Sequence, residues 1–307
     1  MSLDEDTRKL IEAMSAGGAP EFRNMRPEEV RGAVETFTGL QAPPREVGRV
    51  LERSYSGPGG EQRVNVYVPE GDGPFPVVVY FHGGGFVGGS LNVVDEPSRA
   101  LAADAGVVVM TAAYRLAPEH KFPAATDDSL AALAWAAEHA AEFGGDPARL
   151  FVMGDSAGGN LAAVAAIRCR DAGGPALAGQ ILIYPVIDSA LRLPSREEFG
   201  EGYIITAPDL DWFWEQYLRS PQDALDPLAT PSRAASLSGL PRTLVISLEC
   251  EVPRDEAEQY AQQLADAGVD VARRRIPGLI HGSYWMSGAV PRSREIHDAI
   301  VGFLAES

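Results

Sequence analysis

The chain has 307 residues, a length that suits a single α/β domain with an insertion and a large hydrophobic core. Its 43 acidic residues against 26 basic ones give a formal net charge of −17, which argues against a nucleic-acid or anionic-membrane surface, because both require basic patches. With only two cysteines, Cys169 and Cys250, and no cysteine–histidine spacing typical of zinc, the sequence predicts neither a disulfide framework nor a metal site.

The N-terminal segment, residues 1–45, predicts helices. Pro27, followed by two glutamates, suits a helix N-terminus, and Pro43-Pro44 ends the segment. The first residues are acidic and amphipathic, unlike a signal peptide, and no apolar run approaches the roughly 18 residues of a membrane span. We therefore expect a cytoplasmic protein without membrane insertion.

Strands and helices alternate through the middle of the chain. Two alternating runs at 49–55 and 63–68, with the turn-rich stretch 56–60 between them, predict an antiparallel hairpin. Near-continuous apolar runs follow at 77–81, 107–110, 150–153 and 181–184, and helical patterns separate them, notably at 124–141 and 157–171. Apolar strands that alternate with helices are typical of a parallel sheet covered on both faces.

The last part of the chain contains an interruption and then a further strand–helix unit. That unit comprises a strand at 243–248, a helix at 254–267, a strand at 269–276 and a helix that ends near Leu304. Between Asp188 and about Asp226 the alternation breaks, and prolines and aromatic residues gather. These aromatic residues could simply pack a helix onto the core, or the insertion could form a lid with the N-terminal helices. The division that follows is cap helices at 1–45, a core at 46–187 and 227–307, and a cap insertion at 188–226.

The segment Gly154-Asp155-Ser156-Ala157-Gly158 lies between a predicted strand and a predicted helix. A G-x-S-x-G pattern is short and common by chance, but this context favours a nucleophile elbow, a tight turn that needs glycines where side chains would collide. Such a turn lifts the Ser156 hydroxyl above the sheet, and the following helix N-terminus favours negative charge nearby. The alternative is a serine that caps an ordinary strand-to-helix turn.

The segment His82-Gly83-Gly84-Gly85-Phe86 follows the predicted strand at 77–81. Successive glycines let backbone N–H groups approach a substrate without interference from Cβ atoms. An acyl-transfer enzyme needs such donors for the oxyanion of its tetrahedral intermediate, each worth about 3–4 kcal/mol. The alternative is a flexible glycine loop, but this glycine-rich sequence is the partner expected for the elbow, so the two motifs support each other.

A serine nucleophile also needs a base, and the chain has five histidines. His82 precedes the glycines and is expected to brace their loop, while His120 lies in a proline-flanked loop. His139 and His297 fall on predicted helices and are expected at the surface. His281 follows the last predicted strand between turn residues, where a histidine could reach the serine.

The acid of a Ser–acid–His order is expected after the penultimate strand. Four carboxylates lie there within eight residues: Glu249, Glu251, Asp255 and Glu256. The acid must hold the histidine tautomer and stabilise the imidazolium, which either Asp or Glu can do. Glu249 is closest to the strand, and Asp255 and Glu256 fall at the start of the next helix, where an acidic residue stabilises the helix N-terminus.

Together these motifs resemble the hormone-sensitive-lipase family of carboxylesterases, the bacterial branch with a GDSAG elbow. The matching segments run through most of the chain: His82–Phe86, Tyr114–Glu119, Phe122–Ala125, Gly154–Asn160, Tyr184-Pro185 and His281-Gly282. The resemblance implies an α/β-hydrolase fold, a mostly parallel central sheet with helices on both faces and a helical cap. It also implies hydrolysis of short- to medium-chain esters without a cofactor, with a small-molecule ester as the partner.

The resemblance assigns roles to individual residues. It makes Ser156 the nucleophile and His281 the general base, with the backbone N–H groups of Gly83, Gly84 and Ala157 as oxyanion donors. Family members usually carry Asp-Pro-Leu-Arg-Asp-Glu after this strand, and its first Asp is the acid. Aligning the shared Arg-Asp-Glu at 254–256 puts Glu251 in that place, a departure that keeps Asp255 as the runner-up.

Other features leave alternatives open. The residues that could line an acyl or alcohol pocket are Phe86, Asp155, Tyr203, Trp212, Phe213 and Trp214, although the aromatic ones could equally form the core of the cap. Since some relatives have become hormone receptors, a ligand-binding protein on the same fold is an alternative, but such proteins tend to lose a triad member. An amide or aryl-ester hydrolase is a nearer alternative. A homodimer through the strand at 269–276 is also open, although the arginines at 273–275 make that edge unusually charged.

Overall fold

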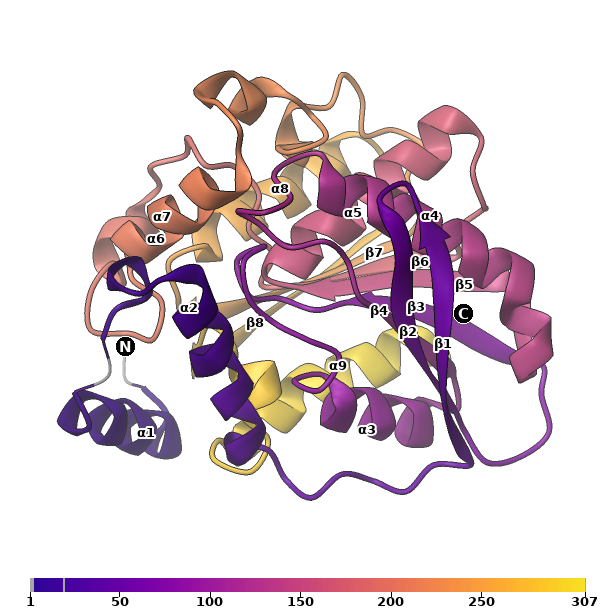
Figure 1. Ribbon diagram of the computed structural model, residues 1–307, viewed down its shortest axis with the longest axis horizontal. Helices are drawn as coiled ribbons and strands as arrows, with labels where there is room; N and C mark the ends of the chain where they lie inside the picture. The colour runs from indigo at the N-terminus through magenta and orange to yellow at the C-terminus, as the bar shows by residue number, and fades with distance from the viewer. Residues whose placement is uncertain (1–2, 19, 307) are drawn as a thin grey trace.

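A computed structural model describes residues 3–18 and 20–306 and contains an eight-stranded sheet in the order β1-β2-β4-β3-β5-β6-β7-β8 (Figure 1). The strands are β1 (Arg49–Gly57), β2 (Gly60–Val68), β3 (Phe75–Phe81), β4 (Val108–Ala112), β5 (Gly145–Asp155), β6 (Gly179–Ile183), β7 (Thr243–Cys250) and β8 (Val271–Ile280). Strand β2 runs antiparallel to β1 and β4, and the other neighbouring pairs are parallel. The predicted α/β-hydrolase sheet is confirmed.

The N-terminal hairpin is tighter than the sequence predicts. The register pairs Ser56 with Glu61 and Gly57 with Gly60, so only Pro58 and Gly59 remain for the turn. The prediction of a turn over 56–60 was therefore wrong at its ends, because turn-forming residues here continue the ladder of strand pairs.

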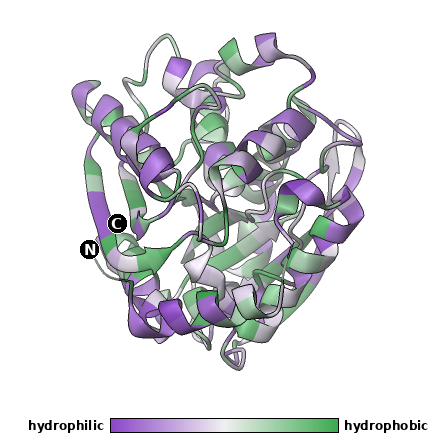
Figure 2. Cartoon of the chain, turned by 90° about the vertical axis from the view of Figure 1, so that its left-hand side faces the viewer, coloured by the Kyte–Doolittle hydropathy of each residue, from purple (hydrophilic) through white to green (hydrophobic). Residues whose placement is uncertain are grey.

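Helices cover both faces of the sheet, as expected for apolar central strands. The α-helices of the described residues are α1 (Glu5–Ala16), α2 (Pro27–Glu35), α3 (Asp95–Ala105), α4 (Ala124–His139), α5 (Ala157–Ala172), α6 (Pro194–Glu198), α7 (Ala207–Tyr217), α8 (Arg254–Asp266) and α9 (Arg294–Ala305). Leu150 and Val152 of β5 join the hydrophobic cluster that contains residues of α4, α5 and α8, whereas Phe151 and Met153 join the one under α3 and α9. Successive side chains of one strand thus fill two separate cores, and Figure 2 shows hydrophilic residues on the outer helices.

Helix α9 carries one correction. His297 was expected at the surface, yet it is buried, with its Nε2 3.0 Å from Asp104 Oδ2 on α3. A histidine on the inner face of an amphipathic helix needs such a polar partner, and the carboxylate at the far end of α3 supplies it.

The N-terminal segment and the insertion lie beside each other near the carboxyl ends of the parallel strands (Figure 1). The rings of Phe22 and Phe213 are 5.7 Å apart, and the Arg23 N–H donates to the Asp209 carboxylate at 2.9 Å. Arg31 of α2 joins this region to the loop after β3, since its Nε donates to the carbonyl oxygen of Val87 at 2.9 Å. Among the described residues, no helix combines the length and apolarity that a bilayer crossing requires.

Candidate active site

Ser156 lies in a sharp turn between β5 and α5, with φ 54° and ψ −119°. A positive φ is uncommon outside glycine and marks a backbone held by its surroundings. A Cβ atom at Gly154 would collide with the carbonyl of Gly158, and one at Gly158 would collide with the carbonyl of Phe81. The two glycines therefore let the helix backbone approach β5 and β3, and the serine is left at the crest of the turn.

Ser156, His281 and Glu251 form a continuous hydrogen-bonded chain. His281 Nε2 lies 2.7 Å from Ser156 Oγ, and His281 Nδ1 lies 2.8 Å from Glu251 Oε2. The second carboxylate oxygen, Glu251 Oε1, accepts a hydrogen bond from the Leu248 N–H at 2.7 Å. Burial raises the pKa of the Glu251 carboxyl, and the hydrogen bond and charge of His281 oppose that rise. The arrangement can remove a proton from the serine and stabilise the resulting imidazolium.

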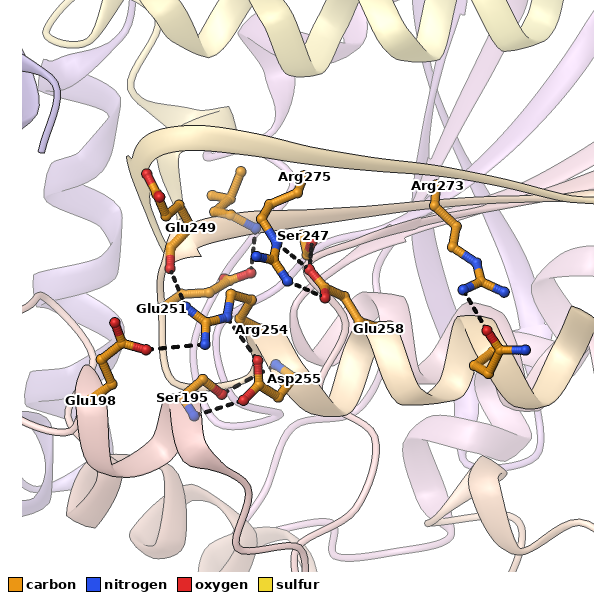
Figure 3. A network of polar contacts seen from close by, with 12 residues as sticks. Ser195, Glu198, Ser247, Glu249, Glu251, Arg254, Asp255, Glu258, Arg273 and Arg275 are labelled. Atoms are coloured by element: carbon orange, nitrogen blue, oxygen red, sulfur yellow. Dashed lines mark hydrogen bonds and ion pairs between the residues drawn. The ribbon is translucent and has the colours of Figure 1, made fainter. Parts of the chain in front are cut away.

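The other three carboxylates after β7 have separate partners. Glu249 Oε2 accepts from the Gly278 N–H at 2.7 Å, and Glu256 Oε2 accepts from the Asp188 N–H at 3.1 Å. Asp255 accepts from the Ser195 N–H at 2.8 Å and from Arg254 Nε at 2.7 Å, and Figure 3 shows it beside the insertion. The runner-up acid is therefore used elsewhere, and only Glu251 is paired with His281.

The glycine loop after β3 departs from the prediction at Gly83. Its N–H donates to Asp155 Oδ1 at 3.0 Å, and the same oxygen accepts from the Tyr80 hydroxyl at 2.8 Å. Since the Gly83 N–H is already bonded to a carboxylate, its expected role as an oxyanion donor is contradicted. The N–H groups of Gly84, Gly85 and Ala157 find no acceptor among the described residues.

Two buried titratable groups hold this glycine loop. Burial raises the pKa of Asp155 to about 7, although its bonds from Tyr80 and Gly83 favour the charged form. His82 Nδ1 lies 2.7 Å from the Gly83 carbonyl, and its ring stacks on Tyr114 at 4.5 Å. Burial lowers the pKa of His82 to about 4, so the ring is neutral at pH 7. His82 thus braces the loop, as the sequence predicted.

A narrow apolar cavity of about 60 Å³ opens onto Ser156. Of the predicted pocket residues, Phe86 and Phe213 line it, and Asp155 reaches its wall at the elbow. Tyr203 packs against Phe199 instead, at 5.3 Å between ring centroids, and Trp212 packs on the ring of Phe213 at 5.2 Å. Trp214, which was also predicted, lines the cavity as well. The remaining apolar lining was not predicted and comes from distant segments: Phe22, Val34, Phe37, Val186, Ile204, Ile205, Leu210 and Trp285.

The described residues contain no group of three or more histidine, cysteine or acidic side chains placed to hold a metal ion. The residues that line the cavity include Ser156 and His281, which are hydrogen-bonded to each other, and Gly84 and Gly85, whose N–H groups have no acceptor among the described residues. This set suits nucleophilic attack on a carbonyl carbon and stabilisation of the oxyanion that results.

Comparisons with known proteins agree with this geometry. Residues 78–285 match a family described by the α/β-hydrolase fold. The chain is 44% identical over 239 residues to the carboxylic ester hydrolase LipN of Mycobacterium tuberculosis, covering 76% of the chain and 64% of LipN. It is 37% identical over 307 residues to an ethyl acetate hydrolase of Pseudomonas putida, covering 96% of each. The structure of a hyperthermophilic esterase from Pyrobaculum calidifontis superposes with a TM-score of 0.94 at 39% identity, covering 99% of the chain and 98% of that esterase.

Proposed function

The chain belongs to the α/β-hydrolase family, in its hormone-sensitive-lipase branch, and from this premise we propose that it is a serine carboxylic ester hydrolase acting through Ser156, His281 and Glu251. The observation that carries the proposal is the position of His281, bonded to Ser156 Oγ at 2.7 Å and to Glu251 at 2.8 Å. A general base within hydrogen-bond reach of its nucleophile, and oriented by a third group, is the arrangement that covalent acyl transfer requires.

The reaction follows from these contacts. Ser156 Oγ attacks the ester carbonyl while His281 Nε2 takes its proton, and Glu251 stabilises the imidazolium. The oxyanion accepts hydrogen bonds from Gly84, Ala157 and, in place of Gly83, Gly85. His281 then protonates the leaving alcohol, and a water molecule activated by the same base releases the acid.

The cavity supports small esters as substrates. Its walls are mostly aromatic and aliphatic, and the N-terminal segment and the insertion both contribute to them. We assign residues 1–45 and 188–226 to a cap on this basis. An apolar cavity of this size favours acyl groups of a few carbons, since longer chains would need the wall to open.

A homodimer through β8 stays a prediction.

Ser156→Ala tests the proposal directly. We expect it to lower kcat for p-nitrophenyl butyrate at least about 10⁴-fold, because the attacking oxygen is lost and only binding and oxyanion stabilisation remain. The wild-type protein should also be labelled by a fluorophosphonate probe, and the variant should not. Ser189→Ala is a matched control within the insertion, because its hydroxyl makes no hydrogen bond among the described residues. Unchanged hydrolysis by Ser156→Ala would rule out the mechanism, and a wild type that resists the probe would favour the ligand-binding alternative.

A further inference from the structure

The cap insertion holds the segment that carries Glu251. We call residues 249–253, from the last two residues of β7 to the start of α8, the acid loop. Ser195 at the start of α6 donates through its hydroxyl to the carbonyl oxygen of Val252 at 2.8 Å. The same hydroxyl accepts from the Asp255 N–H at 3.1 Å, while the Ser195 N–H donates to the Asp255 carboxylate at 2.8 Å. Figure 3 shows this pair of side chains joining the insertion to the start of α8.

Arg254 fixes the other end of the acid loop. Its Nη1 donates to the carbonyl oxygen of Glu249 at 3.1 Å, and its Nη2 donates to Glu198 of α6 at 3.1 Å. Its Nε bonds to Asp255 at 2.7 Å, and its guanidinium lies 5.0 Å from the centroid of the Phe199 ring. The side chain is only 8% exposed, so these contacts lie out of reach of most solvent. Arg254 is therefore held in one orientation by groups from both the core and the insertion.

The chemistry of the α8 terminus explains why the insertion is needed. The first N–H groups of a helix have no partner within the helix, and α8 begins after Pro253, which offers no capping side chain. The Ser195 hydroxyl supplies the missing acceptor from 60 residues away along the chain. The Asp255 carboxylate in turn accepts a hydrogen bond from the Ser195 N–H at the start of α6. The two helix starts thus cap each other.

Glu251 lies between the two carbonyls that these contacts hold, those of Glu249 and Val252. Within the described part of the chain, its own carboxylate is hydrogen-bonded to His281 and to the Leu248 N–H only. A glutamate also has one more rotatable bond than an aspartate, so its carboxylate position depends strongly on where its backbone lies. Movement of a reacting group by about 1 Å can cost about 10²-fold in rate.

We propose that the cap insertion positions the triad acid, with Ser195 and Arg254 as positioning residues that act through Glu251. Asp255 is their partner at the start of α8 and has no contact of its own with His281. The cap is then part of the catalytic apparatus as well as a wall of the substrate cavity. This inference rests on the proposed esterase function.

The first test removes the Ser195 hydroxyl. We expect Ser195→Ala to lower kcat for p-nitrophenyl butyrate about tenfold while KM changes less than twofold, because the substrate does not contact this residue. Ser195→Thr keeps the hydroxyl and should restore most of the loss. Ser189→Ala, in the same insertion, should match the wild type. Wild-type kcat in Ser195→Ala, with the wild type itself active and labelled by the probe, would overturn the inference and leave the esterase proposal intact.

The second test is a double-mutant cycle with Glu251→Gln. If Ser195 acts through Glu251, then Ser195→Ala should change kcat less than twofold in the Glu251→Gln background. If the two losses multiply, Ser195 has only a structural role and the inference is wrong. Should Ser195→Ala fail to fold, Glu198→Gln replaces it in the same cycle. The Glu198 side chain is 42% exposed, and its substitution leaves the hydrogen bonds between Ser195 and Asp255 intact. We expect that variant to lower kcat two- to threefold alone and not at all in the Glu251→Gln background, and losses that multiply would again overturn the inference.

Discussion

The nucleophile elbow and the acid loop supply two members of the same triad, but they are held in different ways. The elbow, residues 154–158, is shaped by its own glycines and by the backbones of β3 and β5 against which they lie. The acid loop is shaped by side chains of the insertion and of α8, one of which is some 60 residues away in sequence. The elbow therefore depends on glycines, which have no side chain, whereas the acid loop depends on the side chains of Ser195 and Arg254.

This difference determines whether a substitution at each site lowers mainly stability or mainly kcat. A close backbone approach leaves no room for an added Cβ atom, so almost any substitution of an elbow glycine disturbs the packing of α5 on the sheet. The acid loop contains no glycine, and its geometry depends on the hydrogen bonds that Ser195 and Arg254 donate to its carbonyl oxygens. We expect elbow substitutions to act mainly on stability and acid-loop substitutions mainly on kcat.

Gly158→Ala should have the largest effect. Its Cβ would overlap the carbonyls of both Phe81 and His82, which belong to β3 and the glycine loop, and neither backbone can move without displacing the sheet. We expect a loss of more than about 4 kcal/mol in the free energy of unfolding, measured by urea denaturation, or no folded protein at all. The control is Gly302→Ala in α9, where an added Cβ meets nothing within 4 Å and should stabilise the helix by about 0.5–1 kcal/mol. Similar stabilities for both variants would contradict the account of the elbow.

Features that depend on local sequence patterns could be predicted, whereas features that depend on contacts between distant residues could not. The elbow, the sheet and His281 were predictable, because they depend on local patterns: glycines in a turn, apolar runs and a loop after the last strand. Glu251 was reached only by aligning the residues that follow it. The bond from Gly83 to Asp155 could not be foreseen, since it joins the ends of β3 and β5, 72 residues apart in sequence.

The cavity walls show the same limit. Phe213 and Trp214 share the α7 helix with Trp212, but only the first two line the cavity, because helix rotation against the core decides which face is presented. Phe22 and Phe37 come from the N-terminal segment and carried no signal of their own. Aromatic composition indicated that a pocket could exist but not which rings would face it.

Glu251→Gln removes the negative charge of the triad acid but leaves the backbone contacts of the acid loop in place. A glutamine has the same shape and can hydrogen-bond to His281, but it cannot stabilise the imidazolium by charge. We expect kcat to fall about 10³-fold, which corresponds to about 4 kcal/mol of transition-state stabilisation. Steady-state hydrolysis of p-nitrophenyl butyrate measures this loss, and thermal unfolding checks that stability is unchanged. Asp255→Asn is the comparison and should lose only about tenfold, so the reverse ranking would transfer the role of acid to Asp255.

Glu256→Gln should have a smaller effect, which concerns the free energy of unfolding and is seen at pH 8 but not near pH 5. Glu256 is buried where α8 meets the start of the insertion, and burial raises its pKa from 4.5 to about 8, with the charge of Asp188 adding to the rise. Between these two pH values the folded protein holds a proton that the unfolded chain has released, so this group makes the folded state less stable as the pH rises from about 4.5 to 8.

A glutamine cannot ionise, and it can still accept the hydrogen bond from the Asp188 N–H. The variant should therefore match the wild type near pH 5 and be more stable than it at pH 8, by an amount on the order of 3–4 kcal/mol, because each unit of pKa shift corresponds to about 1.4 kcal/mol. Urea unfolding of both proteins at the two pH values measures the difference. Glu215→Gln, an exposed residue of α7, should leave the pH dependence unchanged. An equal difference in the free energy of unfolding at both pH values would mean that Glu256 is already ionised in the folded protein at pH 5. The junction of α8 with the insertion would then contain an ionised carboxylate.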